Sequence, residues 1–329
     1  MAKRGKPNQK AAPAKPVPAN PQQKWADWER KVERLQKKDF NELVSGWYSH
    51  IPAIATPGTA PQISLDGIEA VTSIFPRVKG DGEILEPATG ARALVLHESL
   101  YLAHKAVHVT ITCADAIQKG RHTWAVVDAY QASLFAIGSI LAFVGISIER
   151  DQNNFILVDV WAKSSDANKK RQLNLSPPEV YQFVRFKQLD HYQKWALLKR
   201  ILRTISIRCE LVELLRAGLE VHGDLQHANH RNEVLYQSRA WLSLDLCKDI
   251  PTGPIVAVTS KDSMYDEIYS GSVPGTVYLG FALVELCCSF LQSLRNSKII
   301  EGELNFLNRR STARDSVCKF DWSPLYPAQ

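Results

Sequence analysis

The chain has 329 residues, 45% of them hydrophobic, which is enough to bury a sizeable core in one large domain or two smaller ones. Its formal net charge of +6 equals that of residues 1–24 alone, which hold five Lys, one Arg and no acidic residue. Bulk charge therefore does not mark the remaining chain as a nucleic-acid-binding protein. The patterns GxxxxGKS/T, GxGxxG and GxSxG do not occur, which argues against P-loop, dinucleotide-binding and serine-hydrolase chemistry of the common kinds.

Residues 1–24 also contain five prolines and almost no large apolar side chain. Such a segment cannot offset the entropy of ordering, so we expect a disordered basic tail. A solubilising role is favoured over a weak, salt-sensitive contact with RNA, DNA or an acidic partner. The tail lacks the apolar core of a secretory signal and the arginine-rich pattern of a transit peptide.

The six cysteines form no CxxC pair and no Cys/His cluster at zinc spacing. Most lie in apolar helical sequence, where a thiol behaves as a small hydrophobic group. His104 and His108 have the spacing of a chelating pair, but carboxylates are scarce on that face, so a polar seam is favoured. We therefore expect a cytoplasmic protein with no disulfide, no metal and no cofactor.

The predicted elements begin with residues 25–90, a region of one or two amphipathic helices followed by loops rich in Pro, Gly and Thr. A strongly helical segment follows at 91–118. The next helix starts near Thr123 and ends by 145–147, and most of it belongs to an uncharged run of twenty residues, 129–148, the length of a membrane span. No cluster of Lys or Arg flanks this run, so we expect a buried core helix, with membrane attachment as an alternative.

Residues 153–163 (NNFILVDVWAK) alternate apolar side chains and predict an isolated strand or ribbon. The sequence SPPE, starting at Ser176, is a helix-start signal and predicts one long helix or two. A further helix is predicted over 227–241. Residues 249–275 are predicted to be irregular and to precede a helix over 276–310. The aromatic, proline-rich end of the chain should pack as an extended tail.

The segment HANHRNEVLYQSRAW, residues 227–241, contains the strongest candidate for a functional side chain. Asn229 can cap the helix, which places Arg231 in the first turn on the same face as Val234 and Leu235. A buried guanidinium without a partner is very costly. We therefore expect Arg231 to pair with a carboxylate of the protein or to face a cavity where a phosphate supplies the partner.

Two segments are similar to the higher eukaryotes and prokaryotes nucleotide-binding (HEPN) superfamily. YQASLFAIGSILAFVGI, residues 130–146, resembles the family helix YxAxxxAxxALLxxxGI. LLRAGLEVHGDLQHANHRNEVLYQSRAW, residues 214–241, resembles the later segment in which Arg, often followed by Asn, precedes a His or Tyr and a Trp-bearing helix. The resemblance implies a mainly α fold with a minor β element. Its HEPN-like helical bundle would cover residues 91–245, between an N-terminal extension of helices and loops at 25–90 and a C-terminal extension at 246–329. The C-terminal extension would consist of a loop, a helix and an extended tail.

The resemblance also implies an RNA-acting protein, in its active form a metal-independent endoribonuclease of a toxin or antiviral defence system, assembled as a homodimer. RNA or a nucleotide is the implied ligand. Carried over by position, Arg231 would bind the phosphate, Asn232 would orient it, and His230 or Tyr236 would relay protons. The chain has Gln237 where many active members have a histidine six residues after the arginine, a departure that disfavours catalysis.

The alternative function is a non-catalytic helical interaction or scaffold subunit that binds or regulates a catalytic protein partner, with Arg231 in a structural ion pair. The Arg-x(4–6)-His spacing of active members also occurs at three other places: Arg92/His97, Arg185/His191 and Arg216/His222. Chance placement supplies such matches, so no pair is evidence by itself. Gly218 and Gly223 beside the third pair disfavour a rigid helical site there.

Overall fold

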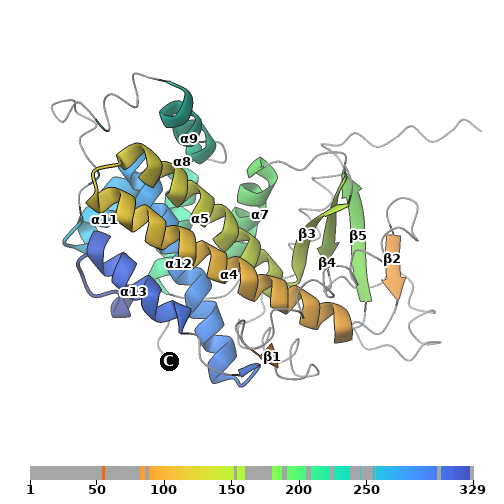
Figure 1. Cartoon of the computed structure of the whole chain (residues 1–329). Coiled ribbons are helices and arrows are strands. Elements are labelled where there is room, and N and C mark those ends of the chain that lie inside the picture. The colour runs from red at the N-terminus through yellow and green to blue at the C-terminus, as the bar shows by residue number, and fades with distance from the viewer. Residues whose placement is uncertain are drawn as a thin grey trace, which may run out of the picture.

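The computed structural model describes residues 54–55, 82–85, 89–151, 154–159, 180–186, 191–204, 209–222, 226–237, 245, 255, 257–301 and 305–326. The predicted tail and the predicted amphipathic helices before residue 54 lie outside these residues, as does Trp241. The described part is mainly α, as predicted, with eight α-helices and a few short strands (Figure 1).

The two predicted long helices are confirmed as a helical hairpin. Helix α4 (Thr89–Gln118) and helix α5 (His122–Phe143) run side by side (Figure 1) and are joined by a turn in which Gly120 has a φ of 69°. Their middles are linked by Ser99 and Ser139, each of which donates its hydroxyl to the other's carbonyl oxygen at 3.0 and 2.8 Å. Two buried hydroxyls are thus satisfied between the helices, which otherwise meet through apolar side chains.

Helix α12 (Val273–Asn296) completes the centre of the core against α5. It starts at Ser272, whose hydroxyl accepts from the backbone N–H of Gly275 at 2.9 Å, an N-cap bond. At Gly280 an added Cβ would lie 2.9 Å from the backbone oxygen of Ala129, so only glycine permits this close approach of α12 to α5. The C-terminal region therefore shares one core with the segment that resembles an HEPN bundle.

Two of the described helices, α5 and α12, are long and apolar enough to span a membrane by length and composition. Of the apolar window in each, 72% and 83% of the residues are buried inside the protein. Packing against other helices accounts for this burial, the arrangement expected of a core helix.

The region after α5 corrects two predictions. Strands β3 (Ile146–Asp151), β4 (Asn154–Asp159), β5 (Val180–Phe186) and β2 (Gly82–Leu85) form an antiparallel sheet in the order β2-β5-β4-β3 at one end of the α4–α5 hairpin (Figure 1). The segment expected to be an isolated strand or ribbon is therefore an inner strand, β4.

The prediction of one long helix or two from Ser176 is wrong for its first part, which is the strand β5, whereas the rest of the segment does hold two helices, α7 (His191–Thr204) and α8 (Glu210–His222). Val180, Val184 and the aromatic residues between and after them favour an extended chain that can pair with neighbours on both sides. Proline residues before such a segment are compatible with a strand start as well as a helix start. The start signal is local, whereas the partner strands β2 and β4 lie elsewhere in the sequence.

The remaining helices surround the core. They are α7 (His191–Thr204), α8 (Glu210–His222), α9 (Gln226–Tyr236), α11 (Lys261–Tyr269) and α13 (Phe306–Val317). Helix α11 lies in the segment predicted to be irregular; it is capped by Ser260, whose hydroxyl accepts from Ser263 N–H at 3.1 Å.

The single helix predicted over 276–310 is in fact two helices. Helix α12 ends at Asn296, and Lys298 then adopts a φ of 56°, which interrupts the helix. A short strand, β6 (Ile300–Glu301), pairs in parallel with β1 (Ile54–Ala55) before α13 starts. The chain end packs against the core as predicted, since Trp322 and Leu325 are buried, but it forms a 3-10 turn (Ser323–Leu325) rather than an extended tail.

Candidate functional site

Helix α9 presents one inward face to the core. His227 and Val234 on this face are buried, whereas Asn229 is exposed. The helix begins at Gln226, so the prediction that Asn229 caps it is wrong. Gln226 donates its side-chain amide to the backbone oxygen of Gly271 at 2.9 Å, which fastens the start of α9 to the turn before α12.

Arg231 lies at the edge of this inward face and is half-buried. Its guanidinium carbon lies 5.6 Å from the centre of the Tyr130 ring on α5, and its Nη1 donates to Asn232 Oδ1 at 2.7 Å. A cation over an aromatic face is stabilising by about 0.5–1 kcal/mol at such a site. Both contacts are with neutral groups, so they hold the guanidinium in place without cancelling its charge.

Tyr130 connects this arginine to a histidine of a third helix. Its ring is buried, at 2% exposure, and its hydroxyl forms a 2.5 Å hydrogen bond with Nδ1 of His191, the exposed first residue of α7. The two ring centres are 5.7 Å apart. The Arg231 guanidinium and the His191 imidazole thus both contact Tyr130.

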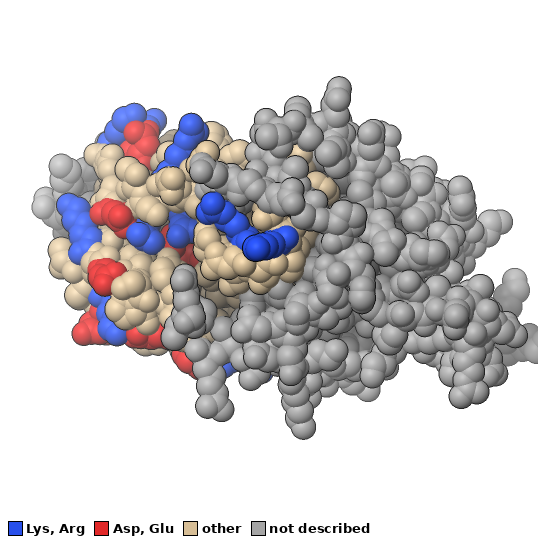
Figure 2. All heavy atoms as spheres, turned by 90° about the horizontal axis from the view of Figure 1, so that it is seen from below, with Lys and Arg blue, Asp and Glu red and all other residues tan. Residues whose placement is uncertain are grey.

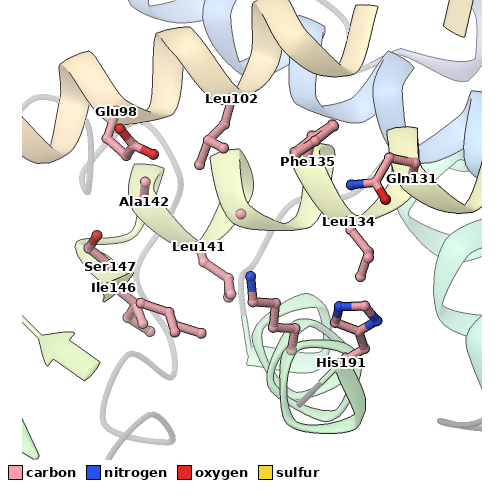
Figure 3. A pocket seen from close by; sticks show the side chains of 13 residues that line it. Glu98, Leu102, Gln131, Leu134, Phe135, Leu141, Ala142, Ile146, Ser147 and His191 are labelled. Atoms are coloured by element: carbon pink, nitrogen blue, oxygen red, sulfur yellow. The ribbon is translucent and has the colours of Figure 1, made fainter. Parts of the chain in front are cut away.

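A pocket of about 180 Å³ adjoins His191 between α4, α5, α7 and the start of β3. Figure 3 shows Gln131 and His191 at one end of this pocket and Glu98 and Ser147 at the other. Between them the walls are mostly apolar, from Leu134, Leu141 and their neighbours. Lys194, one turn after His191, also lines the pocket, so its polar end combines an amide, an imidazole and an ammonium group.

His230 faces α12. Its Nδ1 is hydrogen-bonded to Thr276 Oγ1 at 2.7 Å, and its ring meets His222 edge-on at 6.4 Å. Burial lowers the pKa of His230, so the ring is neutral near pH 7. His230, one of the two predicted proton-relay residues, therefore contacts Thr276 and His222 of the core rather than Arg231.

Three rings form a stack beneath α9. His227 lies between Trp195 and His222, with ring centres 4.4 and 4.7 Å apart and nearly parallel planes. The ring nitrogens Trp195 Nε1, His227 Nε2 and His222 Nδ1 are buried, and none has a hydrogen-bond partner among the described residues. His222 Nε2 is hydrogen-bonded to the carbonyl oxygen of Ile268 at 2.7 Å, so this nitrogen carries the proton.

The pair Arg216/His222 is therefore structural. Arg216 donates to the carbonyl oxygen of Leu202 at 2.5 Å, and His222 is part of the buried stack. Gly218 does not weaken α8: it lies inside the helix, where an added Cβ would come within 2.7 Å of Ile268. The glycine permits the close approach of α8 to Ile268.

The four predicted site residues are only partly brought together. Arg231 and Asn232 are hydrogen-bonded to each other, whereas Tyr236 is the last residue of α9 and is 77% exposed. Sequence reasoning missed His191 and Tyr130. Tyr130 is the first residue of the segment that resembles the family motif, and His191 belongs to a spacing match that chance could supply. Both residues could be seen in the sequence, but no local pattern connected them.

Neither a continuous basic patch on the face of Figure 2 nor a metal-binding cluster is found among the described residues. On the face shown in Figure 2, Lys and Arg lie among Asp and Glu rather than in one continuous basic patch. In the part of the chain that the structure describes, no group of three or more His, Cys, Asp or Glu is placed to hold a metal ion. His104 and His108 are exposed, and the His104 ring packs 4.6 Å from that of Phe306.

Comparison of the chain with protein-family models, with curated proteins and with solved structures found no match.

Proposed function

We propose that this protein is an HEPN-like RNA-acting protein, and that Arg231, Tyr130 and His191 form the centre of a metal-independent endoribonuclease site. One observation carries the proposal: the half-buried guanidinium of Arg231 on α9 and the exposed imidazole of His191 on α7 both contact Tyr130 of α5. These three groups suffice to bind a phosphate and to move a proton without a metal. A setting in a toxin or antiviral defence system belongs to the same proposal.

The reaction is attack of a ribose 2′-hydroxyl on the adjacent phosphodiester. His191 accepts the proton of the 2′-hydroxyl as its oxygen bonds to phosphorus, the bond from phosphorus to the 5′-oxygen breaks, and that oxygen takes a proton from solvent. The products are a 2′,3′-cyclic phosphate and a 5′-hydroxyl. Arg231 binds the phosphate oxygens and the charge that develops on them.

Two neighbours act as positioning residues. The Tyr130 hydroxyl holds His191 through Nδ1, and its ring supports the guanidinium of Arg231. Asn232 fixes the guanidinium through its 2.7 Å hydrogen bond. The pocket of about 180 Å³ beside His191, apolar with an amide and an ammonium at one end, suits a single base next to the cleaved bond.

The homodimer also remains a proposal. A single helix cannot close a site around a phosphate, but α5 and α7 supply the other two sides from the same chain. Light scattering on the purified protein measures the oligomeric state directly. In a dimer, the exposed Tyr236 at the end of α9 is available for contact with the second copy.

The second candidate function is a non-catalytic interaction subunit that regulates a catalytic partner. Two observations favour it: Gln237 occupies the position of the usual histidine, and the large aromatic side chains Trp124 and Tyr236 are 55% and 77% exposed. Exposed aromatic residues are typical of protein contacts.

Incubating purified protein with labelled single-stranded RNA in EDTA separates the two functions. We expect cleavage to 2′,3′-cyclic phosphate ends by the unchanged protein, and its loss in the variants Arg231→Ala and His191→Ala. The matched controls Arg309→Ala and His108→Ala change exposed residues of the same types on other helices and should retain cleavage. Absence of cleavage by the unchanged protein refutes the enzyme and leaves the interaction subunit.

A further inference from the structure

A second pocket, of about 290 Å³, lies between the C-terminal half of α12 and helix α13. It shares no lining residue with the pocket beside His191. Its walls are dominated by neutral polar side chains, namely Ser289, Gln292, Ser293, Asn296, Asn308 and Ser311. Among the described residues that line it, Arg310 is the only charged one.

Arg310 is held in the wall by a buried ion cluster. Its Nε lies 3.0 Å from Oε1 of Glu285, a carboxylate that is 1% exposed, while the Arg310 side chain itself is 14% exposed. The same carboxylate accepts hydrogen bonds from Nη1 of Arg314, at 3.2 Å, and from the hydroxyl of Tyr326. One buried carboxylate thus faces two guanidinium groups.

The cluster is balanced in formal charge, with Glu285 and Asp315 facing Arg310 and Arg314. Arg314 has a second carboxylate, because its Nε donates to Asp315 at 2.8 Å. Arg310 Nε lies at ion-pair distance from Glu285, yet it has no hydrogen-bond partner of normal geometry among the described residues. A guanidinium has five N–H donors, and the ion pair with Glu285 involves only the Nε of Arg310.

The shape and chemistry of the pocket limit what can occupy it. Its volume is at the lower end of the range for small-molecule sites, which suits a ligand of modest size. A single guanidinium favours a single oxyanion, and the surrounding amides and hydroxyls suit hydroxyl or amide substituents. The ion pairs and the fixed helices position Arg310 before a ligand arrives, which lowers the entropic cost of binding.

We propose that the pocket between α12 and α13 binds a small organic molecule with one oxyanionic group, a phosphate or a carboxylate, paired with Arg310. This site is independent of the proposed ribonuclease site and does not depend on it. It makes the C-terminal helices a ligand-binding part of the protein in addition to part of its core.

Isothermal titration calorimetry on the full chain tests the proposal with inorganic phosphate, glycerol 3-phosphate and glycerate, and with glycerol as the uncharged control. We expect saturable binding of at least one anion at concentrations below about 10 mM. Binding of the phosphates but not glycerate identifies a phosphate ligand, and the reverse identifies a carboxylate. If no anion binds, or glycerol binds as well as the anions, the proposal is refuted.

Variants locate the binding without removing the buried arginine. Asn308→Asp places a negative charge in the pocket at an exposed, isosteric position and should weaken anion binding by at least about tenfold. Asn229→Asp makes the same change on α9 and should have no effect. Binding should also persist in Arg231→Ala, which separates it from phosphate binding at the other site. Equal weakening in both Asp variants, or loss in Arg231→Ala, overturns the assignment.

Discussion

The change Glu285→Gln should destabilise the protein strongly, because it removes the only buried carboxylate of the cluster between α12 and α13 while keeping its shape. Glu285 is 1% exposed and faces Arg310 and Arg314, whose side chains are 14% and 13% exposed. Removing one partner of a buried ion pair leaves an uncompensated charge and costs about 3–5 kcal/mol. At roughly 2 °C per kcal/mol for a chain of this size, the melting temperature should fall by about 6–10 °C.

The assay is thermal and urea unfolding followed by circular dichroism, with Glu213→Gln as the matched control. Glu213 pairs with Arg216 on the surface of α8 and is 61% exposed, so the same substitution there should cost about 0.5 kcal/mol or less. Equal losses in the two variants would refute the reasoning, because the difference in burial would then have no energetic consequence. A neutral effect of Glu285→Gln would mean that the two guanidinium groups find other partners.

Three further predictions concern the site and the core. Tyr130→Phe keeps the ring under Arg231 but removes the hydrogen bond to His191, so we expect RNA cleavage to fall by about 10-fold to 100-fold with a shifted pH–rate profile. Burial lowers the pKa of His222 to about 4. At this residue the unfolded chain therefore binds more protons than the folded one between pH 6.5 and 4, so His222 should by itself lower stability by about 3 kcal/mol as the pH drops through this range, a contribution that His222→Gln should remove. Gly280→Ala should cost about 1–3 kcal/mol in unfolding measurements, because its Cβ would lie 2.9 Å from the backbone oxygen of Ala129.

Each of these changes has a control elsewhere in the chain. Tyr269→Phe, at a 41% exposed position, should leave the pH–rate profile unchanged. His108→Gln, on the exposed face of α4, should leave the acid slope of stability intact. Gly138→Ala should cost less than Gly280→Ala, because its Cβ would meet the flexible end of Leu102 at 3.0 Å rather than a backbone atom. The reverse order for the two glycines would contradict the packing argument.

Where local sequence governs structure, prediction succeeded. The helices at 89–118 and 122–143 follow from apolar spacing and the absence of charge, which act over a few turns. Strand β5 was predicted as a helix because its stability comes from hydrogen bonds to β2 and β4, which are distant in sequence. The turn at Lys298 and strand β6 were missed for the same reason, since their partner β1 lies about 250 residues earlier.

The candidate site shows the same division. Residues 227–241 predicted a helix with Arg231 on its apolar face; the structure bears out the helix over 226–236 and leaves Arg231 half-buried. Its partner was expected to be a carboxylate or a phosphate; among the described residues it is the Tyr130 ring and the Asn232 amide. The charge remains uncancelled by these neutral groups, which is why the proposal of a phosphate ligand survives.

The sequence by itself determined that this protein is mainly α-helical, that most of the uncharged run 129–148 belongs to a buried helix, and that Arg231 needs a partner; the end of that run is strand β3. These conclusions depend on periodicity and on the cost of burying a charge, both of which can be evaluated within one segment. Only the tertiary structure decided that Tyr130 joins Arg231 to His191 and that Glu285 is shared by two arginines. Such contacts arise from how separate helices pack, and the residues involved are dozens of positions apart, so no local pattern encodes their meeting.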